Sequence, residues 1–233
     1  MKAIYNKNFV FLHKKRAFFA LLVALFCMCL FCLCGCQKQI DYFDYVSELR
    51  CNLLTAETDG FSLRIYAVEK EYPYAMDGVK RDVSTRAEFR LIAPSGNETY
   101  LLAFGYNGET QSGEMSYDNV KAEYYYSCSL DISATTELSC SISNGKEEIC
   151  LVAKTVKTAE TITPQNALQR VVEYDGETFS ARTDKYGFAG EICIRLIYEE
   201  SPYYYVGVVD RNGKQFAYLL NAESGKILAK RQA

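Results

Sequence analysis

The chain has 233 residues, of which 49% are hydrophobic, and its formal net charge at pH 7 is −3. It contains a single histidine, His13, and no tryptophan. Because His13 lies in a basic N-terminal segment, the rest of the chain cannot build a Ser-His-Asp or Cys-His catalytic system or a histidine-ligated metal site.

The first 36 residues have the pattern of an export signal. Residues 1–16 carry five basic side chains and no acidic one, and residues 17–34 are all apolar. A basic segment followed by an apolar run and small residues is typical of a secretory signal peptide. The ending Leu33-Cys34-Gly35-Cys36 resembles a bacterial lipobox, which implies cleavage after Gly35 and lipidation of Cys36. An uncleaved anchor helix is the alternative, because about 18 apolar residues are just long enough to span a bilayer.

Both interpretations export the rest of the chain, because the basic segment stays in the cytoplasm. We therefore expect a lipid-anchored protein on the extracytoplasmic face of the cell membrane, with residues 1–35 as signal peptide and residues 36–44 as a tether. Removal of residues 1–35 takes away five basic side chains and changes the net charge from −3 to −8. Nucleic acid is not an expected partner, because phosphate binding needs a basic face.

Five cysteines follow the lipobox, and none of them belongs to a C-x-x-C motif: Cys51, Cys128, Cys140, Cys150 and Cys193. This spacing supports neither a zinc ribbon nor a redox pair, and we expect no metal and no cofactor. We expect most of the five to be small buried apolar side chains in strands. A bridge between Cys128 and Cys140 is an alternative, and the sequence leaves the pairing open.

Residues 45–157 alternate apolar and polar positions between short turn sequences. We expect a hairpin over residues 45–68 with its turn at Asp59-Gly60, since Asp-Gly is a strong hairpin signal. A helix over residues 40–54 is the alternative. Further strands are expected at residues 85–92, 99–106, 121–132, 137–143 and 146–155, with a glycine-rich loop through Gly108 and Gly113. This pattern predicts a mainly β domain, an antiparallel sandwich or half-barrel.

The pattern changes at Thr163-Pro164, where Thr163 is placed to cap a helix that begins at Pro164. Strands are then expected at residues 191–198, 203–210, 215–221 and 226–229. A helix followed by such strands, with the ending Asn221-Ala222-Glu223-Ser224-Gly225-Lys226-Ile227-Leu228, resembles the PepSY-type modules of bacterial envelope proteins. The resemblance covers residues 164–231 and implies a second, PepSY-like α+β domain over residues 160–233. It also implies a binding or peptidase-modulating role, and it supplies no catalytic residues.

Two short motifs resemble known sites but sit in turn sequences. Ser143-Asn144-Gly145-Lys146 fits the Ser-x-x-Lys pattern, whose serine must begin a helix, whereas Asn-Gly predicts a hairpin turn. Asp210-Arg211-Asn212-Gly213 lacks the later ligands of a calcium loop and is also predicted to be a turn. The adjacent acids Glu147-Glu148 and Glu199-Glu200 point to opposite faces of their strands, so neither pair can act as a glycosidase acid and base.

Two tyrosine triplets supply the candidate binding residues, which are Tyr124, Tyr126, Tyr203 and Tyr205. Tyrosine is large, stiff and amphipathic, and it can stack on a sugar or anchor a protein. The alternative is that strands simply favour aromatic residues. The leading hypothesis is a non-catalytic envelope lipoprotein that binds a protein, a peptide or a glycan. The alternatives are a carboxylate-dependent hydrolase of glycans or peptides and an accessory or inhibitor of a secreted peptidase.

Overall fold

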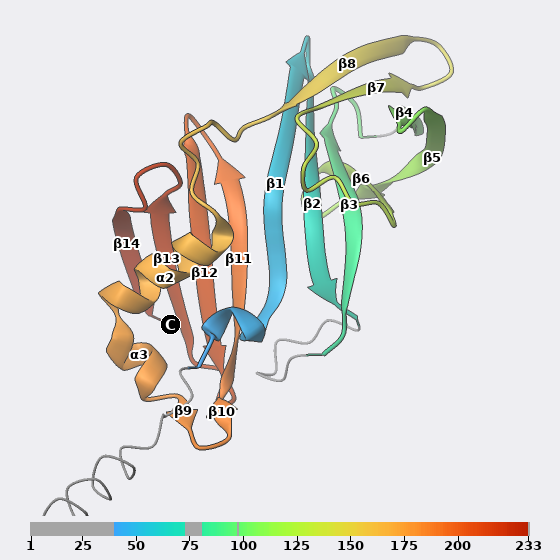
Figure 1. The fold of residues 1–233 in the computed structure, drawn as a ribbon. Helices are drawn as coiled ribbons and strands as arrows, with labels where there is room; N and C mark the ends of the chain where they lie inside the picture. The colour runs from blue at the N-terminus through green and yellow to red at the C-terminus, as the bar shows by residue number, and fades with distance from the viewer. Residues whose placement is uncertain (1–39, 73–80, 97, 233) are drawn as a thin grey trace, which may run out of the picture. The chain divides into compact units, whose positions relative to one another are not determined.

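The computed structural model describes residues 40–72, 81–96 and 98–232. The predicted signal peptide and its lipobox residues Leu33, Cys34, Gly35 and Cys36 lie outside these ranges. In the described ranges, no helix is long and apolar enough to cross a membrane. The fold is mainly β (Figure 1), and its first eight strands are β1 Val46–Thr58, β2 Phe61–Glu71, β3 Val83–Ile92, β4 Tyr100–Tyr106, β5 Glu109–Asp118, β6 Glu123–Cys128, β7 Glu137–Ser143 and β8 Glu148–Thr155.

The predicted first hairpin is confirmed. Strands β1 and β2 pair antiparallel from Glu48↔Lys70 to Thr58↔Phe61. Gly60 adopts a φ of +80° in the turn between them, a conformation that glycine reaches without steric cost. The alternative helix over residues 40–54 is reduced to a 3₁₀ turn, η1 Tyr42–Tyr45.

Strands β1 to β8 form one closed ring rather than two separate sheets. The order is β1-β2-β3-β6-β5-β4-β7-β8, every neighbouring pair is antiparallel, and β8 returns to β1 through Leu54↔Thr155 and Thr55↔Lys154. The predicted antiparallel β architecture is confirmed in this form, as an eight-strand barrel with additional strands. Apolar side chains fill its interior, including Phe89 and Phe104, whose ring centroids lie 4.7 Å apart.

Two predictions within this ring were wrong. Strand β5 occupies the stretch that was expected to be a glycine-rich loop. Asn107 and Gly108 both have positive φ, 51° and 82°, and form a two-residue turn that joins β4 directly to β5. The single strand expected over residues 121–132 ends at Cys128. Of the apolar side chains in β5, only Met115 is buried, so the alternation that marks a strand was weak there.

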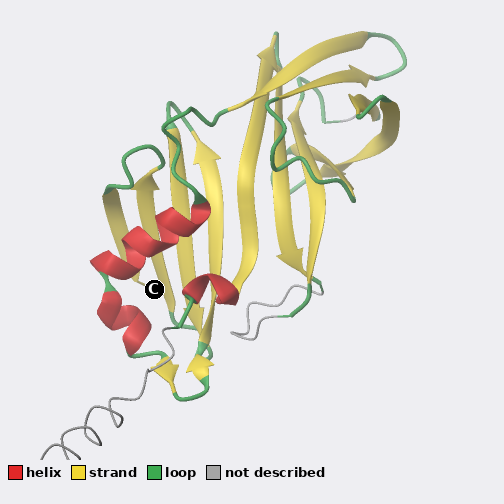
Figure 2. Cartoon of the chain, viewed as in Figure 1, coloured by secondary structure: helices red, strands yellow, loops and turns green. Residues whose placement is uncertain are grey.

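A second group of strands extends the sheet from the other side of β1 (Figure 2). After helix α2 Pro164–Tyr174, helix α3 Gly176–Ser180 and the short pair β9 Thr183–Asp184 and β10 Gly187–Phe188, the chain forms β11 Gly190–Tyr198, β12 Pro202–Asp210, β13 Gln215–Asn221 and β14 Ile227–Gln232. The predicted cap is confirmed, since Thr163 Oγ1 accepts a hydrogen bond from the Asn166 amide at 3.2 Å. The strand β11 pairs with β1 in parallel, from Val46↔Ile192 to Arg50↔Arg195.

Strands β14, β13, β12, β11, β1, β2 and β3 are neighbours in one continuous sheet. The two faces of this sheet differ. One face carries α2 and α3 over β11 to β14 (Figures 1 and 2), and on β2 and β3 it becomes the interior of the barrel. For example, Tyr204 donates from its hydroxyl to the Ile162 carbonyl next to α2. The opposite face, which we call the open face, carries neither of the two helices. The strand pairings place on it Glu48, Arg50, Arg64, Tyr66, Arg86, Glu88, Arg90, Glu123, Arg195, Tyr203 and Tyr205.

Candidate interaction face

The centre of the open face is a buried carboxylate where β1 meets β11. Glu48 is fully buried, and it accepts from Arg50 Nε at 2.7 Å and from Arg195 Nη2 at 2.7 Å and Nε at 3.2 Å. Burial raises the pKa of Glu48, but the two guanidinium groups outweigh it and lower the pKa to about 2. Glu48 therefore stays ionised at neutral pH and joins the two groups of strands.

A second cluster continues the chain of charges across β2, β3 and β6. Arg50 Nη2 lies 3.2 Å from Glu88 Oε2, and Arg90 lies 3.5 Å from the same oxygen and 2.8 Å from Glu123. The ring of Tyr66 lies among these side chains, with Arg50 Cζ at 5.0 Å and Arg90 Cζ at 5.5 Å from its centroid. These are cation–π distances, each contributing about 0.5–1 kcal/mol at a partly exposed site. Acids and arginines thus alternate along the face and fix one another's positions.

The third element is an aromatic ring that lies over a glycine. A Cβ atom at Gly207 would lie 3.1 Å from Tyr205 Cε1 and 2.6 Å from Cys193 Sγ. Only a residue without a side chain therefore lets the Tyr205 ring lie against the β12 backbone. The guanidinium of Arg195 lies 5.7 Å from the centre of that ring. The result is an aromatic surface beside a partly exposed arginine.

The structure divides the four predicted binding tyrosines between two environments. Tyr203 and Tyr205 lie together on the open face and are partly exposed. Tyr124 faces the barrel interior and is 1% exposed, with its hydroxyl donating to the carbonyls of Ser95 and Glu98. Tyr126 also faces inward, against Phe89. Of the four predicted tyrosines, only Tyr203 and Tyr205 therefore lie on the open face, whereas the first triplet contributes its middle residue, Tyr125, which lies opposite Arg90.

The charged part of this face was not predicted, although the sequence shows charged residues at alternate positions of two strands. Arg86, Glu88 and Arg90 occupy alternate positions of one strand, and alternate residues of a strand share a face. Glu48 and Arg50 repeat the pattern in β1. What the pattern could not show was that these two strands lie in the same sheet with only β2 between them.

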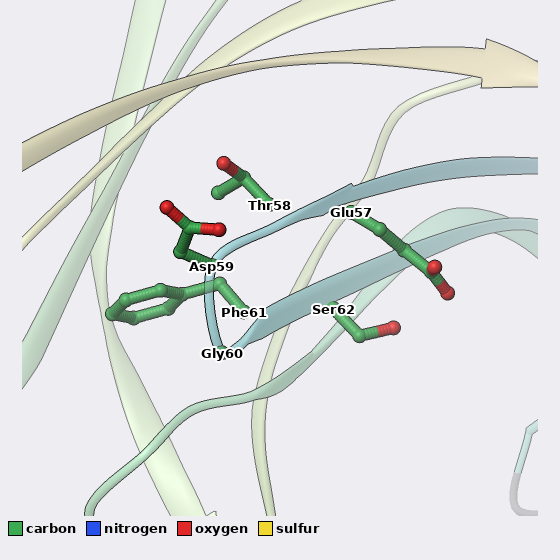
Figure 3. Close-up of a pocket in the computed structure, with 6 residues that line it drawn as sticks. All are labelled: Glu57, Thr58, Asp59, Gly60, Phe61 and Ser62. Carbon is green, nitrogen blue, oxygen red and sulfur yellow. The ribbon is translucent and has the colours of Figure 1, made fainter.

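A hollow of about 500 Å³ lies at the tip of the first hairpin, lined by Glu57, Thr58, Asp59, Gly60, Phe61 and Ser62. Figure 3 shows that Asp59 points to the same side as Thr58, whereas Glu57 points away from it. The two carboxylates therefore do not converge on one point. This hollow supplies no acid and base pair for hydrolysis.

A second polar cluster lies under the helices. Asp175 Oδ2 accepts from Tyr218 Oη at 2.5 Å, from Lys230 Nζ at 2.6 Å and from Thr178 Oγ1 at 2.7 Å. Burial raises the pKa of Asp175, but these donors outweigh it and lower the pKa to about 2. A carboxylate that is ionised at neutral pH and holds three donors on one oxygen suits a structural anchor, which here holds the junction of α2 and α3 against β13 and β14.

The short motifs lie in turns, as their sequences predict. Asn144 Oδ1 accepts from the amides of Lys146 and Glu147 in the β7–β8 turn, and Asp210 Oδ1 accepts from two amides in the β12–β13 turn. In the described part of the chain, no three His, Cys, Asp or Glu side chains are grouped so as to hold a metal ion. The five cysteines after the lipobox are free thiols. Burial raises the pKa of Cys140 to about 12, so its thiol is not a nucleophile at neutral pH.

No family model matches the chain, and no curated protein or solved structure matches it either.

Proposed function

We propose that this protein is a non-catalytic lipoprotein, anchored through Cys36 on the outer side of the cell membrane, that binds another component of the envelope with the open face of its sheet. The observation that carries the proposal is the alternation of arginine, carboxylate and tyrosine across β12, β11, β1, β2 and β3. Arginine and tyrosine are the residue types most enriched at the energetic centres of protein interfaces. Their positions here are fixed before binding, which lowers the entropic cost of association.

The predicted export signal supports the same role, because it places the domain where envelope proteins, peptides and glycans are the available partners. The resemblance of residues 164–231 to PepSY-type modules adds one specific form of it, an accessory or inhibitor of a secreted peptidase. In that form, α2 and the strands that follow it would be the PepSY-like unit.

The test is site-specific photo-cross-linking in intact cells. A photoreactive phenylalanine replaces Tyr203 on the open face, and the matched control replaces Val152, which is 48% exposed on the outer side of β8. The same experiment is repeated with Cys36→Ala. We expect a specific cross-linked product from position 203, none from position 152, and loss of the product in the Cys36→Ala strain.

Each alternative result contradicts a defined part of the proposal. A product from position 152 but not from position 203 would place the interface on another face. An unchanged product in the Cys36→Ala strain would contradict the lipid anchor. A captured peptidase would identify the accessory role, and its activity would then be measured with and without this protein.

A further inference from the structure

Four arginines surround Tyr66 on the open face, and we refer to Arg50, Arg64, Arg86 and Arg90 as the arginine patch. Three successive pairs of the β2–β3 ladder build it, namely Arg64↔Arg90, Tyr66↔Glu88 and Val68↔Arg86. The side chains of Arg50 and Arg90 approach the ring of Tyr66. The patch therefore concentrates positive charge around one aromatic ring on the outer side of β2 and β3.

The charges of the patch are not fully balanced within the protein. Arg64 lies directly opposite Arg90, and like charges in that position destabilise a strand pair. Arg90 is compensated by Glu88 and Glu123. Arg64 forms no ion pair with any residue that the structure describes. An anion that bridges Arg64 and Arg90 would remove this repulsion.

Two of the three carboxylates near the patch, Glu48 and Glu88, lie deeper than its arginines, whereas the side chain of Glu123 is 15% exposed. The side chain of Glu48 is 0% exposed and that of Glu88 is 7% exposed, whereas those of Arg50 and Arg90 are 12% and 21% exposed. A partner that approaches the face therefore meets four partly exposed guanidinium groups and one partly exposed carboxylate, that of Glu123. This is a positive surface on a chain whose net charge is negative, and complementary charge both steers and orients association.

From this geometry we propose that the arginine patch binds an acidic, extended segment of a partner protein. The proposal rests on the binding role proposed above and specifies its partner. Arginine forks bind carboxylates in two-point contacts, and the row of arginines along β2 and β3, with Tyr66 at its centre, suits an extended chain better than a globular ligand.

The test measures binding of a labelled ten-residue peptide of alternating glutamate and alanine, with alternating glutamine and alanine as the neutral control. The protein is the full exported chain in non-ionic detergent, and the readout is fluorescence anisotropy at low and at physiological salt. The variant is Arg64→Gln, which removes no ion pair of the protein itself. Its control is Lys146→Gln, whose side chain is 80% exposed in the β7–β8 turn. Sedimentation with phosphatidylglycerol vesicles runs in parallel.

We expect the acidic peptide to bind at least tenfold more tightly than the neutral one. Arg64→Gln should weaken this binding about fivefold and Lys146→Gln should leave it unchanged. Equal binding of the two peptides, or equal binding by Arg64→Gln and wild type, would overturn the proposal. So would an effect of Arg64→Gln on vesicle binding alone, which would assign the patch to lipid headgroups. If Arg64→Gln leaves cross-linking from position 203 intact and also fails to alter peptide binding, the binding role stands and recognition of acidic segments is rejected.

Discussion

Replacing Glu48 by glutamine tests whether the buried carboxylate joins the two groups of strands. Glu48 is fully buried between Arg50 and Arg195, and glutamine keeps its shape while removing its charge. The pKa of Glu48 is lowered from 4.5 to about 2. At about 1.36 kcal/mol per pH unit, this shift corresponds to roughly 3 kcal/mol of stability at neutral pH. The loss of one partner of a buried pair costs about 3–5 kcal/mol in other proteins, so we expect Glu48→Gln to destabilise the fold by about 3 kcal/mol.

The direction of the pKa shift of Glu48 determines how the stability difference between wild type and Glu48→Gln depends on pH. The folded protein binds the Glu48 proton more weakly than the unfolded chain does, so the stabilisation is present above the ordinary pKa of 4.5. It is lost as the pH falls from that value towards about 2. Wild type and Glu48→Gln should therefore differ most at pH 7 and converge only at about pH 2 and below, where the carboxyl group becomes neutral in both states.

Guanidinium chloride unfolding at a series of pH values measures this difference. Glu137→Gln is the matched control, because Glu137 forms an exposed ion pair with Lys154 at 3.7 Å. Exposed pairs contribute about 0–1 kcal/mol, so this variant should stay close to wild type throughout. A Glu48→Gln protein within about 0.5 kcal/mol of wild type at pH 7 would refute the reasoning, because a surface substitution has an effect of that size. A difference that persists unchanged at pH 2 would refute the assignment to the charge.

Three further substitutions test other parts of the fold. Gly113→Ala places a Cβ atom within 2.2 Å of Tyr126 Cε2. We expect overpacking to lower the melting temperature and to reduce the free energy of unfolding by about 1–3 kcal/mol. An unchanged melting temperature would show that the Tyr126 ring moves freely. Thr163→Ala removes the cap of α2 and should cost about 1 kcal/mol in denaturant unfolding, whereas Thr163→Asp should retain the stability. Asp175→Asn removes the charged partner of Lys230; we expect a loss of roughly 1 kcal/mol at pH 7, discounted for solvent screening. Since the pKa of Asp175 is lowered from 3.8 to about 2, that loss should decrease as the pH falls below about 4 and vanish near pH 2, and circular dichroism melts over pH 2–7 measure it.

Local signals predicted the local structure. The Asp59-Gly60 turn, the Thr163 cap and the alternation of β12 and β13 each depend on a few neighbouring residues, and each was correctly located. Strand β1 departs from simple alternation in one respect. Alternation would place Leu49 and Leu53 on the same side, but the register shifts between Arg50 and Asn52. A bulge at this point moves every later side chain of the strand to the other face. No residue type in this stretch indicates that a bulge is present.

The sequence pattern could not predict which strands pair with one another. Alternation of apolar and polar residues shows that a stretch is a strand with one buried face. It does not show which strands lie beside it, because the backbone can form equally good hydrogen bonds with different neighbouring strands. The return of β8 to β1 and the parallel pairing of β1 with β11 are both decided by packing far along the chain. The same limit explains the tyrosine triplets. In β12 the middle residue, Tyr204, is buried, whereas in β6 the outer two face the interior, and sequence alone does not show which parity faces the core.

The open face belongs to neither predicted segment alone, and this follows from the edges of β1. Its first half pairs with β11 and its second half with β8, while its other edge pairs with β2 along its length. Glu48 lies in the first half, so its carboxylate can reach Arg195 of one group and Arg50 of the other. Had β8 paired with all of β1, the ring would have closed without the later strands, and Tyr205 and Tyr66 would not share a face. The parallel pairing at the start of β1 is therefore the structural condition for the proposed binding face.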